Sequence, residues 1–209
     1  MPIYNAAPPW RPSRSQVFTV YHGCTTLDLQ RIASSNLAPY TGALRVASGR
    51  VTTDFGRGFY TTSIERQAKQ WAWYRYYDPK LSRATACQPC VLRFTLDRHA
   101  LAQLSSIAFA LGHYDDEDFW SLVQHCRQSV DADPANSVAE VMHDHHGPVR
   151  HKNGNWYDVA YGPVAAFWTQ RSAMVNTDQL SFHTQAGEDM LNAIINANDP
   201  TTFGWSPVI

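Results

Sequence analysis

The stretch Val51–Thr62 constrains the fold of this chain more than any other. It reads Val-Thr-Thr-Asp-Phe-Gly-Arg-Gly-Phe-Tyr-Thr-Thr, so two closely spaced glycines lead straight into an aromatic pair. Gly56 and Gly58 allow backbone torsions and close approaches that other residues resist. The following Thr62-Ser63-Ile64-Glu65 has the pattern of a capping box, which begins a helix. We therefore predict a turn, a strand that offers the flat faces of Phe59-Tyr60 to a ligand ring, and then a helix.

The remaining chain alternates between short strands and helices. We predict strands over residues 16–21, 90–96, 156–161 and 179–183, and helices over residues 25–37, 64–77, 115–130 and 184–195. Residues 97–114 fit neither pattern clearly, and residues 38–53 and 131–155 have the composition of loops. This order predicts an α+β fold. We expect an extended N-terminal arm at 1–16, a single domain at 17–197 and a turn-rich C-terminal tail at 198–209.

Composition excludes several classes of protein. The chain has 209 residues, 12% of them aromatic, which favours one globular domain over a disordered chain. Its net charge of −1 gives no basic field for nucleic acid or anionic membranes. No apolar run is long enough to cross a bilayer, and the N-terminus lacks a signal-peptide pattern. The spacing of the four cysteines does not indicate a secreted disulfide framework, so we predict a cytoplasmic, reducing compartment, or export without a cleavable signal.

Two groups of motifs together resemble the ADP-ribosyltransferase superfamily. Val20-Tyr-His-Gly23, a capped helix, Asp54-Phe-Gly-Arg-Gly-Phe-Tyr-Thr-Thr62 and then Ala68 and Trp71 are similar to the branch shared by poly(ADP-ribose) polymerases and diphtheria-type toxins. Trp156-Tyr-Asp-Val-Ala-Tyr-Gly-Pro-Val164 and Asp178-Gln-Leu-Ser-Phe-His-Thr184 resemble a little-characterised microbial domain family assigned to the same superfamily. The resemblance spans residues 17–195. It implies an ADP-ribosyltransferase-like split β-sheet core with flanking helices.

The resemblance also implies NAD as co-substrate and assigns roles to individual residues. NAD would bind bent, and its glycosidic bond would break toward an oxocarbenium-like ribose in a preorganised site. His22 would hydrogen-bond the adenosine ribose, Gly23 would hold the nicotinamide amide through its backbone, and Tyr60 would stack on the nicotinamide. Trp71 takes the place of the family's second stacking tyrosine. The remaining cofactor-binding residues implied by the motif are Thr25, Asp54, Phe55, Gly56, Gly58 and Phe59.

The chain departs from the family at the catalytic acid. Gln179 occupies the position of the family's catalytic Glu, and with Tyr60 and His22 it completes the expected catalytic set. An amide can accept the same hydrogen bond but lacks the charge that strengthens it. Asp178 would point to the opposite face, because neighbouring strand residues alternate. Glu140 and Glu188 are further candidates for the acid.

Structural interpretations compete with these roles. His22 could be a capping or loop residue, Asp54 could form an Asx-turn, and Trp71 lies on an apolar helical face that favours a place in the core. Zinc is an alternative if Cys87-Gln-Pro-Cys90 joins one of His143, His145, His146 or His151. Since a single C-x-x-C fixes no partner, we expect no metal. No nucleophilic arrangement is legible beside Cys24.

Four functions follow from these observations. The first is mono-ADP-ribosylation of an unknown protein or nucleic-acid acceptor, because the resemblance ties chain elongation to the absent Glu. The second is NAD hydrolysis. The third is a catalytically weak module that binds NAD, ADP-ribosyl groups or a protein partner. The fourth is transfer chemistry on RNA 2′-phosphates, which requires positioned arginines that the sequence does not place.

Overall fold

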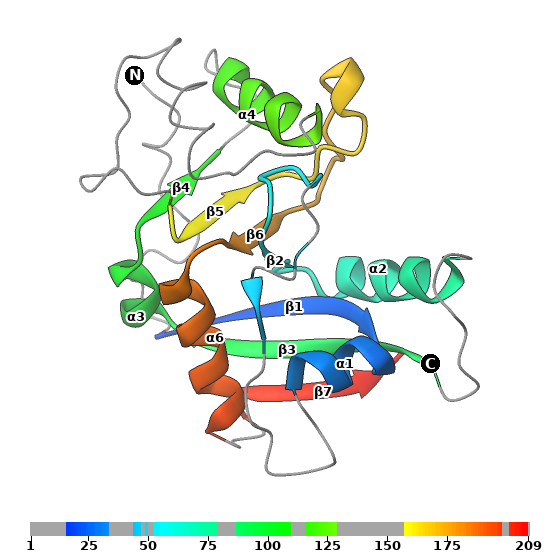
Figure 1. Ribbon diagram of the computed structural model, residues 1–209, viewed down its shortest axis with the longest axis vertical. Coiled ribbons are helices and arrows are strands. Elements are labelled where there is room, and N and C mark those ends of the chain that lie inside the picture. The colour runs from blue at the N-terminus through cyan, green and yellow to red at the C-terminus, as the bar shows by residue number, and fades with distance from the viewer. Residues whose placement is uncertain are drawn as a thin grey trace.

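The computed structural model describes residues 16–33, 44–46, 49, 52–78, 87–109, 116–128, 157–197 and 201–208, which form two β-sheets flanked by helices (Figure 1). The first sheet is antiparallel, with the order β1-β3-β7, and consists of β1 (Val17–Thr25), β3 (Pro89–Asp97) and β7 (Phe203–Pro207). The second has the order β2-β6-β5-β4 and consists of β2 (Phe59–Thr61), β6 (Gln179–Phe182), β5 (Val159–Gly162) and β4 (Ser106–Ala108). In the second sheet, β4 runs parallel to β5. The chain is an α+β protein.

The helices divide between the two sheets. Their bounds are α1 (Thr26–Ala33), α2 (Glu65–Tyr77), α3 (Arg98–Gln103), α4 (Asp116–Gln128) and α6 (Gln185–Asn196). Figure 1 shows α1, α2 and α6 beside the first sheet and α4 beyond the second. None of these described helices is long and apolar enough to cross a membrane.

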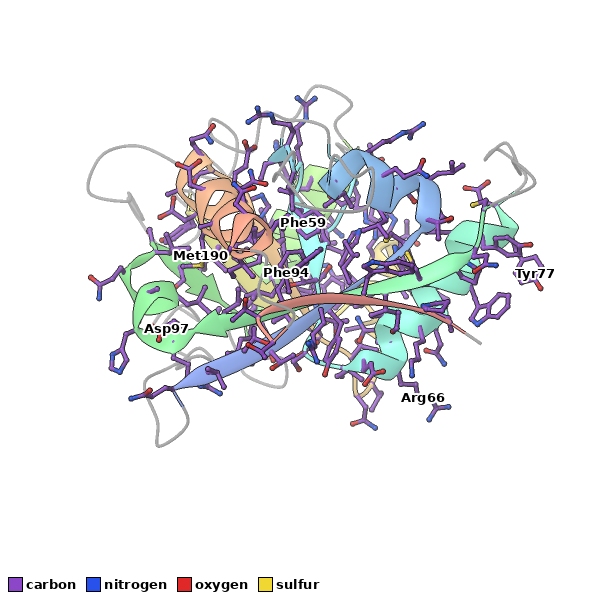
Figure 2. The ribbon with its side chains drawn as sticks, turned by 90° about the horizontal axis from the view of Figure 1, so that it is seen from below. Phe59, Arg66, Tyr77, Phe94, Asp97 and Met190 are labelled. Atoms are coloured by element: carbon purple, nitrogen blue, oxygen red, sulfur yellow. The ribbon has the colours of Figure 1, made fainter. Side chains whose placement is uncertain are left out.

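Two of the three hydrophobic clusters among the described residues follow this division. The first joins β1 and β3 to β2, β6 and α6, and Phe59 and Phe94 meet within it edge to face with ring centroids 5.9 Å apart (Figure 2). The second lies between the second sheet and α4 and contains Phe55 and Phe119. Burial of apolar side chains on both faces of the second sheet therefore holds the protein together.

Among the described residues, the backbones of the two sheets pair with each other at one isolated bridge. The Tyr21 amide donates to the Thr62 carbonyl at 2.7 Å, and the Thr62 amide donates to the Tyr21 carbonyl at 2.9 Å. Tyr21 lies in the edge strand β1, and Thr62 follows β2, the edge strand of the other sheet. The antiparallel pairing extends no further as a regular ladder among the described residues, so the two sheets diverge from this point.

Most predicted elements are confirmed, with shifts at their ends. The predicted strands correspond to β1, β3, β5 and β6, and the predicted helices to α1, α2, α4 and α6. The region 97–114 contains α3 and β4. The prediction of a separate C-terminal tail is wrong, because Phe203–Pro207 pairs with β3 as β7. Residues 1–15 of the predicted arm, Glu140 and the four histidines considered for zinc lie outside the described residues.

The sequence has a helix-start pattern at Thr25-Thr-Leu-Asp28 as well as at Thr62–Glu65, and the two have different outcomes. At α1 the Thr25 amide donates to the Asp28 carboxylate at 3.2 Å, and the Asp28 amide donates to the Thr25 hydroxyl at 3.3 Å. This is the reciprocal cap that the pattern predicts. At α2 the capping-box prediction is wrong, because the N-cap is Ile64 and no side chain caps the helix. The Thr62 hydroxyl donates instead to the carboxylate of Asp178, 116 positions away.

Candidate functional site

His22 fills the place where β1 and β2 diverge. Its Nδ1 donates to the carbonyl oxygen of Tyr60 at 2.6 Å, which leaves Nε2 as an acceptor on the neutral ring. The imidazole stacks on Phe59 with ring centroids 4.4 Å apart and an interplanar angle of 28°. Burial lowers the pKa of His22 below its ordinary value of 6.5, so the ring is neutral at pH 7. The imidazole thus supplies the Tyr60 carbonyl with the hydrogen bond that a neighbouring strand would otherwise donate.

Gly23 presents its backbone on the edge of β1 that faces away from β3. The direction of backbone groups alternates along a strand, and those of Tyr21 bond Thr62 on the β2 side. The N–H and C=O of Gly23, two residues further, therefore point to the same side. Gly23 is buried beneath α2, and a Cβ there would overlap the carbonyl oxygen of Ala68 and lie 2.8 Å from the amide of Ala72. Only glycine allows this approach of helix and strand.

Helix α2 contacts both Gly23 in β1 and the residue that precedes β6. Ala68 and Ala72 are buried against β1, whereas the Gln67 side chain reaches β6, where its amide donates to the Asp178 carbonyl at 2.6 Å. Trp71 lies one turn beyond Gln67 on the same side of the helix. Its side chain is 51% exposed and stacks on Tyr74 with ring centroids 5.3 Å apart. The competing interpretation of Trp71 as a core residue is therefore wrong.

Asp178 is a buried carboxylate next to the bridge between the sheets. Oδ1 accepts from the Thr62 hydroxyl at 2.5 Å and from the Ser63 amide at 2.9 Å, and Oδ2 accepts from the Ser63 hydroxyl. Tyr161 approaches from β5, and burial, with a smaller effect of the Asp178 charge, raises its pKa to about 12. This cluster ties the start of β6 to the segment between β2 and α2.

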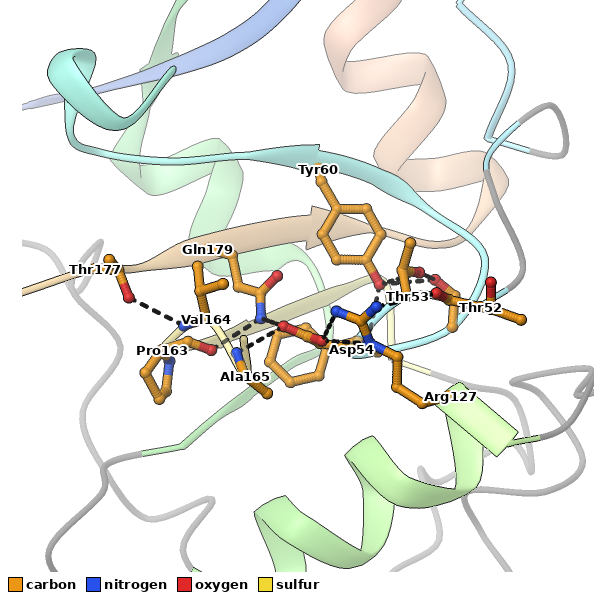
Figure 3. A network of polar contacts seen from close by, with 12 residues as sticks. Thr52, Thr53, Asp54, Tyr60, Arg127, Pro163, Val164, Ala165, Thr177 and Gln179 are labelled. Carbon is orange, nitrogen blue, oxygen red and sulfur yellow. Dashed lines mark hydrogen bonds and ion pairs between the residues drawn. The ribbon is translucent and has the colours of Figure 1, made fainter. Parts of the chain in front are cut away.

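A second polar network lies on the opposite face of the second sheet, toward α4 (Figure 3). Asp54 is 2% exposed, and its Oδ1 accepts from Arg127 Nε at 2.8 Å and from Nη2 at 2.5 Å. Its Oδ2 accepts from the Gln179 amide at 2.6 Å and from the Ala165 backbone amide at 2.9 Å. Gln179 also donates to the Pro163 carbonyl at 2.8 Å. Both oxygens of the buried Asp54 carboxylate therefore accept two hydrogen bonds each.

Tyr60 belongs to this second network. Its hydroxyl accepts from the Thr53 hydroxyl at 2.9 Å and from the Phe55 amide at 3.0 Å, and it donates to the Gly56 carbonyl at 2.7 Å. Burial raises the pKa of Tyr60 far above its ordinary value. The ring therefore fastens the turn at 53–56, where Gly56 adopts a φ of 76°.

The expectation that the rings of His22 and Tyr60 face one bound molecule is wrong. Adjacent residues of a strand point to opposite faces, and His22 stacks on Phe59, the neighbour of Tyr60 in β2. The Tyr60 ring packs instead with the cluster beside α4 (Figure 3). Gln179 lies on this second face with Tyr60, while Asp178 binds Thr62, so the expected opposition of Asp178 and Gln179 is confirmed.

The other predicted cofactor residues have structural partners. The polar groups of Thr25 cap α1, and Asp54 forms a buried ion pair rather than a simple Asx-turn. Phe55 is fully buried, and Gly58 packs against the imidazole of His183, 2.9 Å from where a Cβ would lie. Of the predicted set, His22 and Gly23 lie at the junction of β1, β2 and α2, and Trp71 is exposed on α2.

Comparison with known proteins assigns the chain to a family. A family model described as "Protein of unknown function (DUF3990)" matches residues 41–192. The chain belongs to the DUF3990 family. No curated protein and no solved structure matches it. The match includes β2, α2 and β6 and therefore both polar networks, whereas His22 and Gly23 precede it.

Three residues of these networks, Arg127, Tyr161 and Gln67, were not predicted from the sequence of this DUF3990 protein. Arg127 lies 73 positions from Asp54, and Tyr161 also comes from a separate strand. No local pattern signals such contacts. Gln67 could have been noted, because it precedes Trp71 by one helical turn and shares its side of the helix.

The DUF3990 chain should lose stability in mild acid through His183. Nδ1 of His183 donates to the Arg57 carbonyl at 2.8 Å, and Nε2 contacts the Ser181 hydroxyl at 2.8 Å. Burial lowers the pKa of His183 from 6.5 to about 4. As the pH falls below 6.5, His183 therefore takes up a proton in the unfolded chain before it does so in the folded chain. The contribution of the buried, neutral ring to the free energy of unfolding is present above pH 6.5 and is lost as the pH falls toward 4. The expected loss is about 2–3 kcal/mol.

Urea unfolding of wild type and His183→Gln at pH 7.5 and pH 4.5 measures this loss. The variant cannot titrate at this position, so the difference between its two unfolding free energies should be smaller than that of wild type. His99→Gln, at an exposed position, serves as the control and should behave like wild type. Equal pH dependence of wild type and His183→Gln would contradict the assignment.

Proposed function

We propose that this protein is an ADP-ribosyltransferase-like enzyme that binds NAD at the junction of β1, β2 and α2 and transfers ADP-ribose to a macromolecular acceptor. The carrying observation is the edge of β1 at Gly23, whose N–H and C=O face the β2 side beyond the Tyr21–Thr62 bridge. The division into three-stranded and four-stranded sheets supports the proposal, because it resembles the split core expected from the motifs.

The chemistry of these groups suits the nicotinamide end of NAD. A primary carboxamide needs one acceptor and one donor side by side, and the backbone C=O and N–H of Gly23 supply both. The half-exposed ring of Trp71 offers a stacking face on the adjacent helix. Nε2 of the neutral His22 can accept a hydrogen bond from a ribose hydroxyl. Because Gly23 is buried, we place the approach of NAD on the side where Trp71 is exposed.

In this proposal Asp178, rather than Gln179, supplies the negative charge that favours an oxocarbenium-like ribose. Gln179 is occupied by Asp54 and Pro163 on the other face. Asp178 lies beside Thr62, which bonds the backbone of Tyr21 two residues before Gly23. A carboxylate held by preorganised donors can stabilise developing positive charge without reorganising.

One observation favours a second candidate, a module that binds NAD or ADP-ribosyl groups with weak turnover. The carboxylate of Asp178 already accepts hydrogen bonds from Thr62 and Ser63 and contacts Tyr161. A group engaged so fully has little remaining capacity to bind a ribose hydroxyl. Transfer and binding differ in whether nicotinamide is released.

Nicotinamide release from NAD by the purified protein tests the proposal. We expect Trp71→Ala to lower kcat/KM by at least tenfold, equivalent to about 1.4 kcal/mol, because it removes the stacking face. Tyr74→Ala, which removes the neighbouring exposed ring, is the matched control and should change kcat/KM much less. Labelled ADP-ribose on protein or nucleic acid indicates transfer, and free ADP-ribose indicates hydrolysis. NAD binding without nicotinamide release would support the binding module, and the absence of both would contradict the proposal.

A further inference from the structure

Two cysteines oppose each other across the ladder between β1 and β3. Cys24 and Cys90 are direct partners in the antiparallel register, and their Sγ atoms are 3.4 Å apart. Directly opposed residues of antiparallel strands have Cα atoms about 4.5–5.5 Å apart. This separation lies within the range of about 4.4–6.8 Å that disulfides span. The backbone therefore requires no large movement to join the two sulfurs.

The surroundings of the pair determine when such a bond can form. Both thiols are free in this structure, and Cys24 and Cys90 are 1% and 0% exposed. The hydrogen bond to Cys90, followed by burial, raises the pKa of Cys24 well above its ordinary value. Thiol–disulfide exchange requires a thiolate and access for the attacking group. Exchange is therefore disfavoured once the strands have packed and is available while the chain folds.

We propose that Cys24 and Cys90 are a cross-strand disulfide site, oxidised when the chain folds in the presence of a small disulfide such as oxidised glutathione. One thiolate attacks the glutathione disulfide and releases one glutathione, which gives a mixed disulfide. The second cysteine thiolate then attacks the protein sulfur of that mixed disulfide and releases the second glutathione. Two cysteine thiols are oxidised, one glutathione disulfide is reduced, and the two protons leave with the glutathione thiols.

The bond would fix β1 beside the proposed NAD site without depending on it. Cys24 follows Gly23 directly, and the disulfide would close a loop between positions 66 residues apart. A loop of this length stabilises a folded chain mainly by restricting the unfolded one. The expected rise in the thermal midpoint is about 5–15 °C for a chain of this size. The inference stands whether or not the protein binds NAD.

Refolding of the full-length Cys87→Ser variant tests the inference. The substitution removes the competing thiol at Cys87, so the tryptic peptide 84–93 contains Cys90 alone, and the peptide 15–31 contains Cys24. The reduced, unfolded variant is refolded with mixed reduced and oxidised glutathione, free thiols are blocked, and the digest is examined by mass spectrometry. We expect peptides 15–31 and 84–93 to be joined and Cys126 to carry the blocking group.

Stability of the oxidised and reduced forms provides a second readout. The midpoint should rise on oxidation of the Cys87→Ser variant and of Cys87→Ser/Cys126→Ala, and should not rise when Cys24→Ala or Cys90→Ala is added. Blocking reagent or glutathione on both Cys24 and Cys90 after oxidative refolding would overturn the proposal. A cross-link that leaves the midpoint unchanged or lowers it would overturn it as well, because the bond would then not fit the native ladder.

Discussion

Gly23→Ala is expected to lower the free energy of unfolding by about 4 kcal/mol or more. The added Cβ would overlap the carbonyl oxygen of Ala68 and lie 2.8 Å from the amide of Ala72. Both atoms belong to the backbone of α2, so no flexible side chain can move aside. Relief requires a shift of the whole helix from β1 and with it the loss of contacts around Val91.

Urea unfolding of Gly23→Ala measures this cost, and Gly187→Ala is its matched control. In α6 a Cβ at Gly187 meets side-chain atoms of Phe182 at 3.2 Å and the carbonyl oxygen of Asp158 at 3.3 Å. The helix preference of Ala, about 1 kcal/mol over Gly, offsets this mild crowding. We expect Gly187→Ala to remain within about 1 kcal/mol of wild type. Equal stability of Gly23→Ala and wild type would contradict the described packing of α2 on β1.

Gln179→Glu is expected to destabilise the protein by about 3 kcal/mol at pH 7 instead of restoring a catalytic acid. The Gln179 amide donates to the buried Asp54 carboxylate at 2.6 Å. A Glu side chain would bring a second carboxylate to that oxygen, and two like charges so close cannot both remain ionised in a buried place. Arg127 already directs its Nε and Nη2 donors at the other oxygen of Asp54.

Chemical unfolding distinguishes the charge from the loss of a hydrogen bond. Gln179→Met has similar volume and no donor, so it should destabilise the protein less than Gln179→Glu does. The double variant Asp54→Asn/Gln179→Glu exchanges the amide and the carboxylate and should recover part of the stability lost by Gln179→Glu. A stable Gln179→Glu variant with faster nicotinamide release would contradict the structural role of Gln179 and would return it to the catalytic set.

Local patterns in the sequence predicted most of the elements, because caps and hydrophobic periodicity act over a few residues. The cap at Thr25–Asp28 is an example. Strand β7 was missed because Phe203–Pro207 contains Gly and Pro, which are typical of turns. Proline is tolerated in β7 because this strand lies at the edge of its sheet. The pairing with β3 depends on residues more than a hundred positions away.

The candidate site was harder to predict than the fold. The strand around Phe59 and Tyr60 was predicted, yet both aromatic side chains were assigned to one ligand wall. The alternation of a strand places them on opposite faces, which is a local rule that could have been applied. The contact of Asp54 with Arg127 could not have been inferred locally, since it depends on how α4 packs on the second sheet.

Titration of NAD into isotope-labelled protein, followed through assigned backbone amide and indole N–H resonances, tests the central claim most directly. We expect saturable changes at Gly23, the Trp71 indole and Thr62, and much smaller changes at Gln179 and Ala165 on the opposite face. Absence of any change at millimolar NAD, or changes confined to residues around Asp54, would contradict a dinucleotide site at the junction of β1, β2 and α2.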